Sequence, residues 1–225
     1  MSKEDILLLI QSQGILPLFY HDDKEVCVSV IDSLYHAGIR CVEFTNRGAY
    51  ALQNYKHLVS IINERWQGLQ LGIGTILNAD EASDFIKAGA SFIVCPGVIP
   101  GVAEVVNKAS LLWIPGCLTA TEIIVAKDND AKLVKIFPGS LSGPSYISAL
   151  KEIFPDLLFM PTGGVEVTES SIRSWFNAGV CAVGLGSKVI SKEALVNKDY
   201  QGIQTLVSQA MSLVKEVKEI RLAEK

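Results

Sequence analysis

Three segments of the sequence share one pattern, an Ala-Gly pair followed at once by a short apolar run. They read "AGIRCVEF" (37–44), "AGASFIVCPG" (88–97) and "AGVCAVGLG" (178–186). A glycine in this place is typical of the left-handed residue that ends a helix, and the run after it is typical of a buried parallel strand. The repeated joint between helix and strand therefore predicts an α/β fold.

Buried apolar runs recur along the whole chain, with amphipathic segments at helical spacing between them. The runs lie near 15–20, 41–45, 70–74, 92–95, 111–115, 133–137, 158–161 and 181–184. This alternation predicts one (β/α)8 TIM barrel, with an extra N-terminal helix over 2–13 and a closing helix over 199–222. A doubly wound open sheet is the alternative, but "HDDKE" follows the first strand where that fold carries a glycine-rich fingerprint.

Composition narrows the class of protein. Hydrophobic residues make up 49% of the chain, and no linker or low-complexity stretch interrupts it, so we expect a single domain over 1–225. A formal charge of −4 without a basic run argues against nucleic acid and membrane partners. The first apolar run is too short for a signal peptide, so we expect a cytoplasmic protein. The five widely spaced cysteines show no metal-ligand spacing, and we expect neither disulfides nor a metal.

In a barrel of this kind the chemistry gathers at the carboxyl ends of the strands. Gly163-Gly164 follows the seventh expected strand, and Gly184-Leu185-Gly186-Ser187 follows the eighth. Glycines let backbone N–H groups approach an anion closely, and a helix N-terminus after such a loop adds a favourable dipole. Two such loops in adjacent positions predict a phosphate site, although each alone is also typical of an ordinary tight turn.

Lys135 lies in the middle of an apolar strand, "LVKIFPGS" (133–140). By the period of two it shares the inner face with Leu133 and Phe137, and Glu43 on the second strand also faces inward. An amine in a desolvated site has a lowered pKa and can attack a ketone to form a Schiff base, while a nearby carboxylate supplies acid/base catalysis. The alternative is a buried structural Lys-Glu pair.

Arg47 and Thr75 are candidates for binding a carboxylate. Arg47 follows Glu43 by four residues, where its planar guanidinium could hold a carboxylate through two hydrogen bonds. Thr75 follows the third strand and could place a hydroxyl on the same anion, or cap the next helix. We expect both side chains at the mouth of the barrel.

The chain resembles the 2-keto-3-deoxy-6-phosphogluconate/4-hydroxy-2-oxoglutarate (KDPG/KHG) aldolase family, Class I enzymes on a (β/α)8 barrel. The motifs that carry the resemblance are "VEFTNRGA", "GIGTILN", "VCPG", "IPGCLTATE", "VKIFPGS", "PTGGV" and "GLGS". The resemblance implies that Lys135 forms the Schiff base and that Glu43 is the general acid/base, acting partly through a bound water. It also implies that Arg47 and Thr75 bind the pyruvate carboxylate.

Further site residues follow from the same resemblance. Pro96 and Phe137 would pack around the pyruvate portion of the substrate, and Thr162 would face its hydroxylated part. The distal phosphate would be held by Gly163, Gly164, Gly184, Gly186 and Ser187. The resemblance implies a small 2-keto acid substrate, a homotrimer and no cofactor, because the protonated imine is the electron sink.

Three other activities remain open at this point. A 2-keto-3-deoxy-6-phosphogalactonate aldolase differs in stereochemistry at C4, and Thr162 with its neighbours bears on that choice. A phosphosugar isomerase would need no Lys135. A sensor that binds sugar phosphates would keep the glycine loops but could lose both Lys135 and Glu43, so the presence of both residues favours catalysis.

Overall fold

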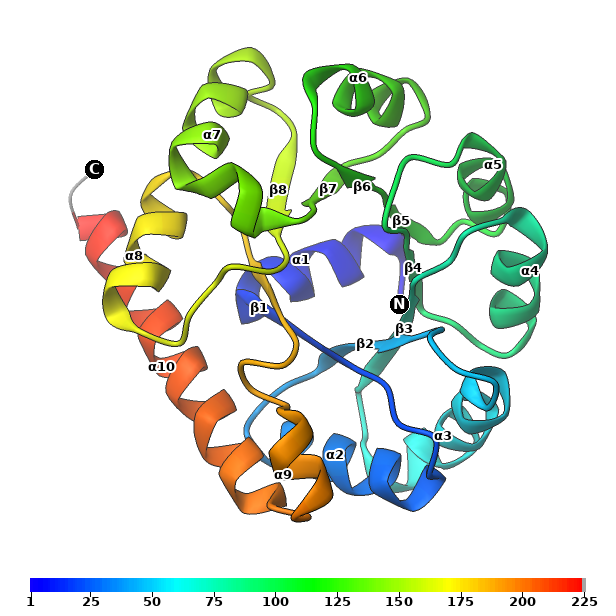
Figure 1. Cartoon of the computed structure of the whole chain (residues 1–225). Coiled ribbons are helices and arrows are strands. Elements are labelled where there is room, and N and C mark those ends of the chain that lie inside the picture. The colour runs from blue at the N-terminus through cyan, green and yellow to red at the C-terminus, as the bar shows by residue number, and fades with distance from the viewer. Residues whose placement is uncertain (224–225) are drawn as a thin grey trace.

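The strands lie in the centre of the molecule with helices arranged around them, in a computed structural model that describes residues 1–223 (Figure 1). The strands are β1 (Ile15–Phe19), β2 (Cys41–Thr45), β3 (Gln70–Gly74), β4 (Phe92–Val94), β5 (Leu112–Ile114), β6 (Gly116–Cys117), β7 (Leu133–Ile136), β8 (Leu158–Pro161) and β9 (Val183–Leu185). The helices are α1 (Lys3–Gln13), α2 (Lys24–His36), α3 (Ala51–Arg65), α4 (Ala79–Lys87), α5 (Pro100–Lys108), α6 (Ala120–Asp128), α7 (Gly139–Ile153), α8 (Glu169–Asn177), α9 (Lys192–Val196) and α10 (Tyr200–Ala223). The predicted α/β class is confirmed, and each expected apolar run overlaps a strand.

All strand pairs are parallel, and they form a curled sheet in two parts. A six-stranded part has the order β5-β4-β3-β2-β1-β9, and a three-stranded part has the order β6-β7-β8. The expected strand at 111–115 is interrupted at Pro115, which has no N–H to donate to a ladder. Isolated contacts continue across both junctions: the N–H of Lys135 donates to the carbonyl of Pro115 at 2.9 Å, and Thr162 forms a bridge with Gly184.

The Ala-Gly joints adopt the backbone conformation that the sequence predicts. Gly38, Gly89 and Gly179 have φ angles of 99°, 95° and 100°, in the left-handed region that favours glycine. Each glycine follows the alanine that caps a helix and precedes the next strand. These local signals therefore determine where helices α2, α4 and α8 end.

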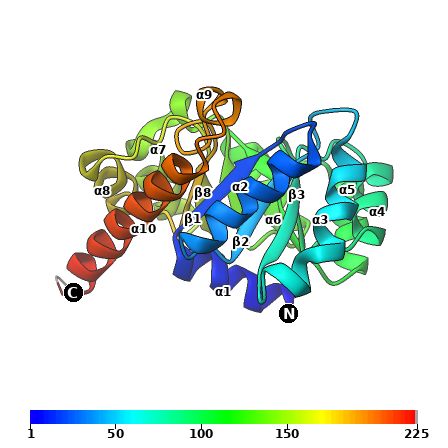
Figure 2. The same cartoon turned by 90° about the horizontal axis from the view of Figure 1, so that it is seen from below.

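The inside of the curled sheet is packed with side chains, so it is a core and not a channel. Leu16, Cys41, Phe92, Leu133 and Met160 are among the buried residues of this inner cluster. Helix α1 adds two fully or almost fully buried isoleucines to the same cluster and closes one end of the sheet. Figure 2 shows α1 below the strands and α9 at the opposite end. The carboxyl ends of the strands face away from α1, which leaves that end available for a site.

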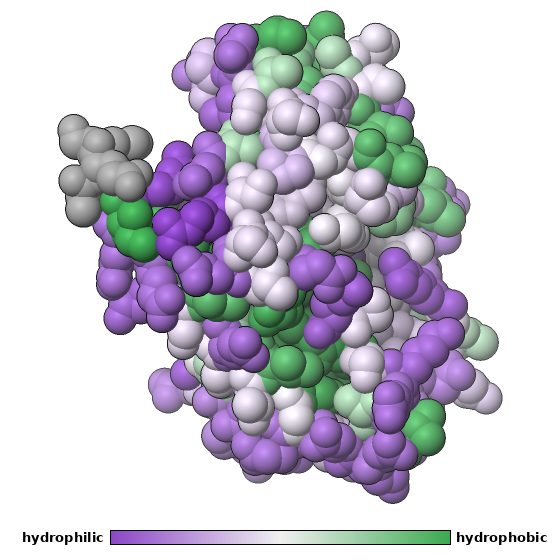
Figure 3. Space-filling model, turned by 60° about the vertical axis from the view of Figure 1, so that its left-hand side comes forward, coloured by the Kyte–Doolittle hydropathy of each residue, from purple (hydrophilic) through white to green (hydrophobic). Residues whose placement is uncertain are grey.

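The helix layer is amphipathic, as the sequence pattern indicates. Its outer surface mixes hydrophilic residues with apolar ones, as Figure 3 shows for one side of the molecule. Helix α7 is interrupted at Gly143, whose φ of 72° and ψ of 171° are not helical, and Pro144 follows it. The closing helix is α10. Within the described part of the chain, every helix is too short or too polar to cross a lipid bilayer.

Candidate active site

Lys135, the next-to-last residue of β7, and Glu43, the central residue of β2, meet inside the curled sheet. The Nζ atom of Lys135 lies 3.6 Å from Oε1 of Glu43, and the two side chains are 5% and 1% exposed. Leu133 belongs to the inner cluster, whereas Val134 and Ile136 pack in the outer one beneath the helices. The predicted orientation of the Lys135 side chain, inward and toward Glu43, is therefore confirmed.

The Glu43 carboxyl group is held by packing more than by hydrogen bonds. Both of its oxygens are buried, and neither has a hydrogen-bond partner within residues 1–223. One side of the group lies against Gly74, where a side chain would overlap it. Burial of a polar atom without a partner is costly. The buried carboxylate therefore has acceptor capacity that the described protein does not use.

Arg47 and Thr75 lie next to each other, just after the ends of β2 and β3. The Nε atom of Arg47 is 3.4 Å from Oγ1 of Thr75, and the Arg47 side chain is exposed. Thr75 has a φ of 62°, which is an outlier for a β-branched residue. Such a conformation costs about 1–3 kcal/mol, and strain of this kind concentrates at functional sites. The structure thus places two groups that can bind a carboxylate side by side.

A cavity of about 190 Å³ opens beside these residues. Its lining includes eight of the residues singled out from the sequence, namely Arg47, Phe137, Thr162, Gly163, Gly164, Gly184, Gly186 and Ser187. Lys135 lies next to it, with Nζ 5.2 Å from the centre of the Phe137 ring. Glu43, Thr75 and the half-buried Pro96 are not part of this lining. The predicted phosphate and keto-acid regions are therefore neighbours.

The glycine loops of the cavity require glycine for two different reasons. Gly163 and Gly164 have φ angles of 86° and 76°, which disfavour other residues. At Gly184 the requirement is space, because a side chain there would collide with Thr162. The hydroxyl of Thr162 is buried without a hydrogen-bond partner in the described structure, so it is available to a ligand.

Neither glycine loop leads directly into the helix that follows it. Helix α8 begins at Glu169, capped by Thr168, and a turn follows Ser187 before the five-residue helix α9. The reason is that these loops continue for several residues before a capping side chain occurs. An anion in this cavity would therefore depend on backbone N–H groups and side chains and not on a helix dipole.

Four residues that line the cavity were not predicted as site residues, namely Leu18, Val165, Leu185 and Lys188. Lys188 carries an ammonium group 2.7 Å from Oε1 of Glu166, and both side chains are half exposed. Its position directly after Ser187 was the signal that could have identified it. Leu18 carried no such signal, because an apolar residue at a strand end is typical of packing.

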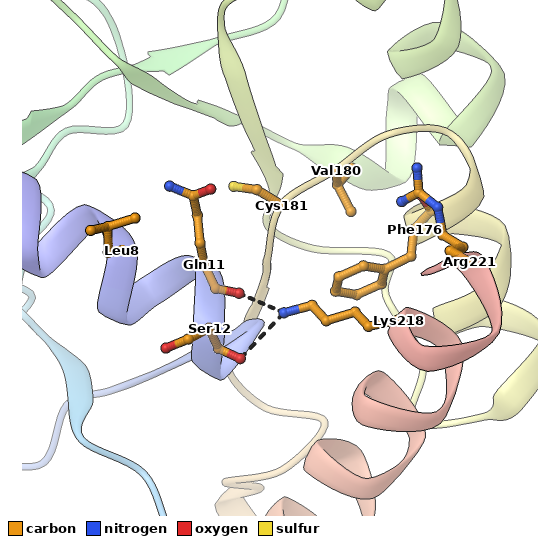
Figure 4. Close-up of a pocket in the computed structure, with 8 residues that line it drawn as sticks. All are labelled: Leu8, Gln11, Ser12, Phe176, Val180, Cys181, Lys218 and Arg221. Carbon is orange, nitrogen blue, oxygen red and sulfur yellow. Dashed lines mark hydrogen bonds between the residues drawn. The ribbon is translucent and has the colours of Figure 1, made fainter. Parts of the chain in front are cut away.

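A larger cavity, of about 510 Å³, lies near the opposite end of the molecule, between α1, α8 and α10 (Figure 4). Lys218 reaches from α10 to the last turn of α1 and donates to the carbonyls of Gln11 and Ser12. Arg221 donates to the carbonyl of Phe176 near the end of α8. Because both cations satisfy carbonyls at helix C-termini, this region is explained by helix packing.

Four of the cysteines are buried and Cys181 is partly buried, as is typical of small hydrophobic residues. All five are free, and burial raises the pKa of the Cys95 thiol, which lies near the Lys135 and Glu43 pair, to about 12. Cys95 also accepts a hydrogen bond from Nε1 of Trp113 at 3.4 Å. A thiol with such a pKa is not a nucleophile at neutral pH. Across residues 1–223, no three His, Cys, Asp or Glu side chains are grouped as a metal site requires.

A buried lysine beside a carboxylate, at the carboxyl ends of parallel strands, is typical of an enzyme active site on an α/β barrel scaffold. A family model for aldolases, KDPG and KHG aldolase, matches residues 6–206. The chain belongs to this family and is an aldolase, which is a lyase.

Named relatives agree with this assignment. The 2-dehydro-3-deoxy-phosphogluconate aldolase of Pseudomonas aeruginosa is 29% identical over 205 residues, 90% of each chain. The 2-dehydro-3-deoxy-6-phosphogalactonate aldolase of Escherichia coli K12 is 33% identical over 153 residues, 66% of this chain and 69% of that one. A solved 4-hydroxy-2-oxoglutarate/2-dehydro-3-deoxyphosphogluconate aldolase from TTHB1 superposes with a TM-score of 0.80 at 29% identity, covering 93% of this chain and 98% of that chain.

Proposed function

We propose that this protein is a Class I aldolase that releases pyruvate from a 2-keto acid through a Schiff base. Its substrates are 2-keto-3-deoxy-6-phosphogluconate, cleaved to pyruvate and glyceraldehyde 3-phosphate, and/or 4-hydroxy-2-oxoglutarate, cleaved to pyruvate and glyoxylate. The observation that carries the proposal is the 3.6 Å approach of the Lys135 ammonium to the buried Glu43 carboxylate. The names of the relatives support the choice of substrates.

Lys135 is the proposed nucleophile. Its free amine adds to the C2 ketone to give a carbinolamine, which loses water to form an iminium ion. The positive nitrogen then accepts the electron pair of the C3–C4 bond as that bond breaks. An aldehyde leaves, and pyruvate remains bound as an enamine. Because the iminium is the electron sink, the reaction as proposed uses no metal and no other cofactor.

Glu43 is the proposed acid/base group. It takes the proton of the C4 hydroxyl as the aldehyde forms, partly through a water molecule, and returns a proton to C3 of the enamine. Hydrolysis of the resulting iminium releases pyruvate and regenerates Lys135. The two carboxylate oxygens without hydrogen-bond partners support this role, because proton exchange at Glu43 breaks no existing hydrogen bond.

The remaining site residues bind the substrate in this proposal. Arg47 and Thr75 hold the pyruvate carboxylate, while Pro96 and Phe137 pack against the pyruvate carbons. The hydroxyl of Thr162 faces the hydroxylated part of the substrate. The phosphate lies among the backbone N–H groups of Gly163, Gly164, Gly184 and Gly186 and beside the hydroxyl of Ser187. All five residues line one cavity.

The proposal extends to the whole chain. We infer that residues 1–225 form one domain in which the two parts of the sheet complete a single (β/α)8 barrel, with α1 closing its lower end. The protein acts on a small molecule and not on nucleic acid or membranes. We infer a homotrimer in the cytoplasm, in line with the family resemblance.

The alternative with the best support is a 2-keto-3-deoxy-6-phosphogalactonate aldolase, because one relative at 33% identity carries that name. It would use the same Lys135 and Glu43 chemistry and differ only in the accepted C4 configuration. Parallel assays with both C4 epimers separate the two. A phosphosugar isomerase or a sensor is less well supported, because neither requires the buried pair.

Trapping of the imine tests the proposal. The protein is incubated with pyruvate and sodium borohydride, and its intact mass and peptide map are measured. We expect one reduced pyruvate adduct, on Lys135. The Lys135→Met variant should show none, while Lys132→Met, which removes an exposed lysine three residues away, should be labelled like wild type. The absence of an adduct in folded wild-type protein would exclude the Class I mechanism.

A further inference from the structure

An ion pair bridges the two glycine loops of the phosphate cavity. Lys188 lies in the turn after β9 and Glu166 in the loop after β8, with 2.7 Å between Nζ and Oε1. Each side chain is 51% exposed, so the pair lies at the rim of the cavity and not in its interior. Lys188 lines the cavity and Glu166 does not.

The cavity carries only positive charge. Arg47 and Lys188 are its cationic lining residues, and no aspartate or glutamate belongs to its lining. The backbone around Gly163 and Gly164 adds N–H groups in the left-handed conformation that favours anion binding. Glu166 is the carboxylate already paired with the Lys188 ammonium, so it competes with a bound anion for that group.

The backbone that carries the pair is anchored, while the lysine side chain is not. The N–H of Glu166 donates to Oγ of Ser171 at 3.1 Å, and Val165 is 1% exposed. Gly164 packs against the backbone of Ser140. A lysine stem has four rotatable bonds and three donors at its end. The Lys188 ammonium can therefore turn from Glu166 toward the cavity while the loop that carries Glu166 stays in place.

We propose that Lys188 is a specificity-determining residue that leaves Glu166 to bind the substrate's phosphate group. A phosphate ester carries a charge of about −1.5 to −2 at pH 7, against −1 for a carboxylate, so it outcompetes Glu166 for the ammonium. A substrate that ends in a hydroxyl does not displace Glu166, and Lys188 then remains paired with Glu166. The inference rests on the proposed function and adds to it the basis of a preference for phosphorylated 2-keto acids.

A purely structural role for the pair predicts a different behaviour. If Lys188 and Glu166 only hold the loops together, removing either one should lower activity on all substrates alike. If the Lys188 ammonium instead moves from Glu166 to the phosphate, the two variants should have opposite effects. Loss of Lys188 then weakens phosphate binding, and loss of the Glu166 charge strengthens it. The two variants therefore separate the two roles.

Kinetics give the first test, using 2-keto-3-deoxy-6-phosphogluconate and the same acid with a free 6-hydroxyl. We expect Lys188→Met to lower the ratio of their kcat/KM values about three- to tenfold, the range of a partly exposed charge contact. Glu166→Gln should raise the ratio about twofold. Lys192→Met removes an exposed lysine outside the cavity and should leave the ratio unchanged. An equal loss on both substrates, or an unchanged ratio in Lys188→Met, overturns the proposal.

Binding of glycerol 3-phosphate gives a second test that needs no turnover. Calorimetry at constant ionic strength should show about three- to tenfold weaker binding to Lys188→Met and tighter binding to Glu166→Gln. In the Lys188→Met background, Glu166→Gln should have a smaller effect. Equal affinity in wild type and Lys188→Met overturns the inference. If wild type binds this probe but forms no pyruvate adduct with borohydride, the aldolase function fails while the Lys188 result still stands.

Discussion

Gly74 lies directly against the carboxyl group of Glu43, on the neighbouring strand. A Cβ atom at Gly74 would overlap Oε1 and lie within 2.8 Å of Cγ. The backbone of Gly74 is ordinary, so space and not conformation requires glycine here. The position of the proposed acid/base group therefore depends on the absence of a side chain on β3.

The Gly74→Ala variant should retain its fold and lose activity. The added methyl pushes the Glu43 carboxyl group away from Lys135, and we expect kcat to fall about 10- to 100-fold, since small displacements of a reacting group have effects of this size. Steady-state kinetics with thermal unfolding check this. Gly101→Ala is the control, because a Cβ at Gly101 meets nothing within 4 Å. Wild-type activity in Gly74→Ala would contradict the assigned role of Glu43.

Substitutions of Lys135 and Glu43 should have strongly non-additive effects on the free energy of unfolding. Lys135→Met or Glu43→Gln alone disrupts the pair, and Lys135→Met leaves the Glu43 carboxyl group buried without its cation, which typically costs about 3–5 kcal/mol. The double variant removes both charges and should be at least as stable as the better single one. Urea unfolding of the four proteins gives the coupling free energy. Additive effects would show that the two groups do not interact.

Activity separates the two members of the pair. Lys135→Met should abolish cleavage, because no amine remains to form the imine. Glu43→Gln should keep the borohydride adduct but lower kcat about 10²- to 10⁴-fold, the usual contribution of a general acid/base. Measurement of adduct yield and turnover in the same samples checks this. Normal turnover in Lys135→Met would be incompatible with a Schiff base at this position.

A negative charge at Ser187 should discriminate between substrates. Ser187→Asp places a carboxylate in the lining of the phosphate cavity, and like charges repel. We expect kcat/KM for 2-keto-3-deoxy-6-phosphogluconate to fall about 10- to 100-fold, and much less for 4-hydroxy-2-oxoglutarate. Ser187→Ala serves as the control for loss of the hydroxyl. Equal losses on both substrates would place the phosphate elsewhere.

The lowered pKa of Lys218 should make the free energy of unfolding depend on pH. Burial lowers the pKa of its ammonium below the usual 10.5 in the folded protein, so between the two values the folded state binds fewer protons than the unfolded state. The contribution of Lys218 to the free energy of unfolding must then rise as the pH rises through that window. Unfolding of wild type and Lys218→Met at several pH values up to 10.5 tests this. Lys215→Met, an exposed lysine on the same helix, should show no such trend.

Much of the fold followed from local patterns in the sequence. The Ala-Gly joints predicted helix ends at Gly38, Gly89 and Gly179, because few residues other than glycine accept the left-handed conformation. The alternation of apolar runs and amphipathic segments predicted the order of strands and helices. The break at Pro115 was not predicted, since its effect depends on which neighbour its backbone faces.

The sequence by itself determined which residues stand at the strand ends, and therefore that Lys135, Glu43 and the glycine loops could share one end of the molecule. Residue spacing along a strand decides which side chains face inward, and that rule is local. Only the tertiary structure decided the 3.6 Å approach of Lys135 to Glu43, the contact with Gly74 and the pairing of Lys188 with Glu166. These contacts join residues far apart in the chain, and the curvature and register of the parallel sheet bring them together.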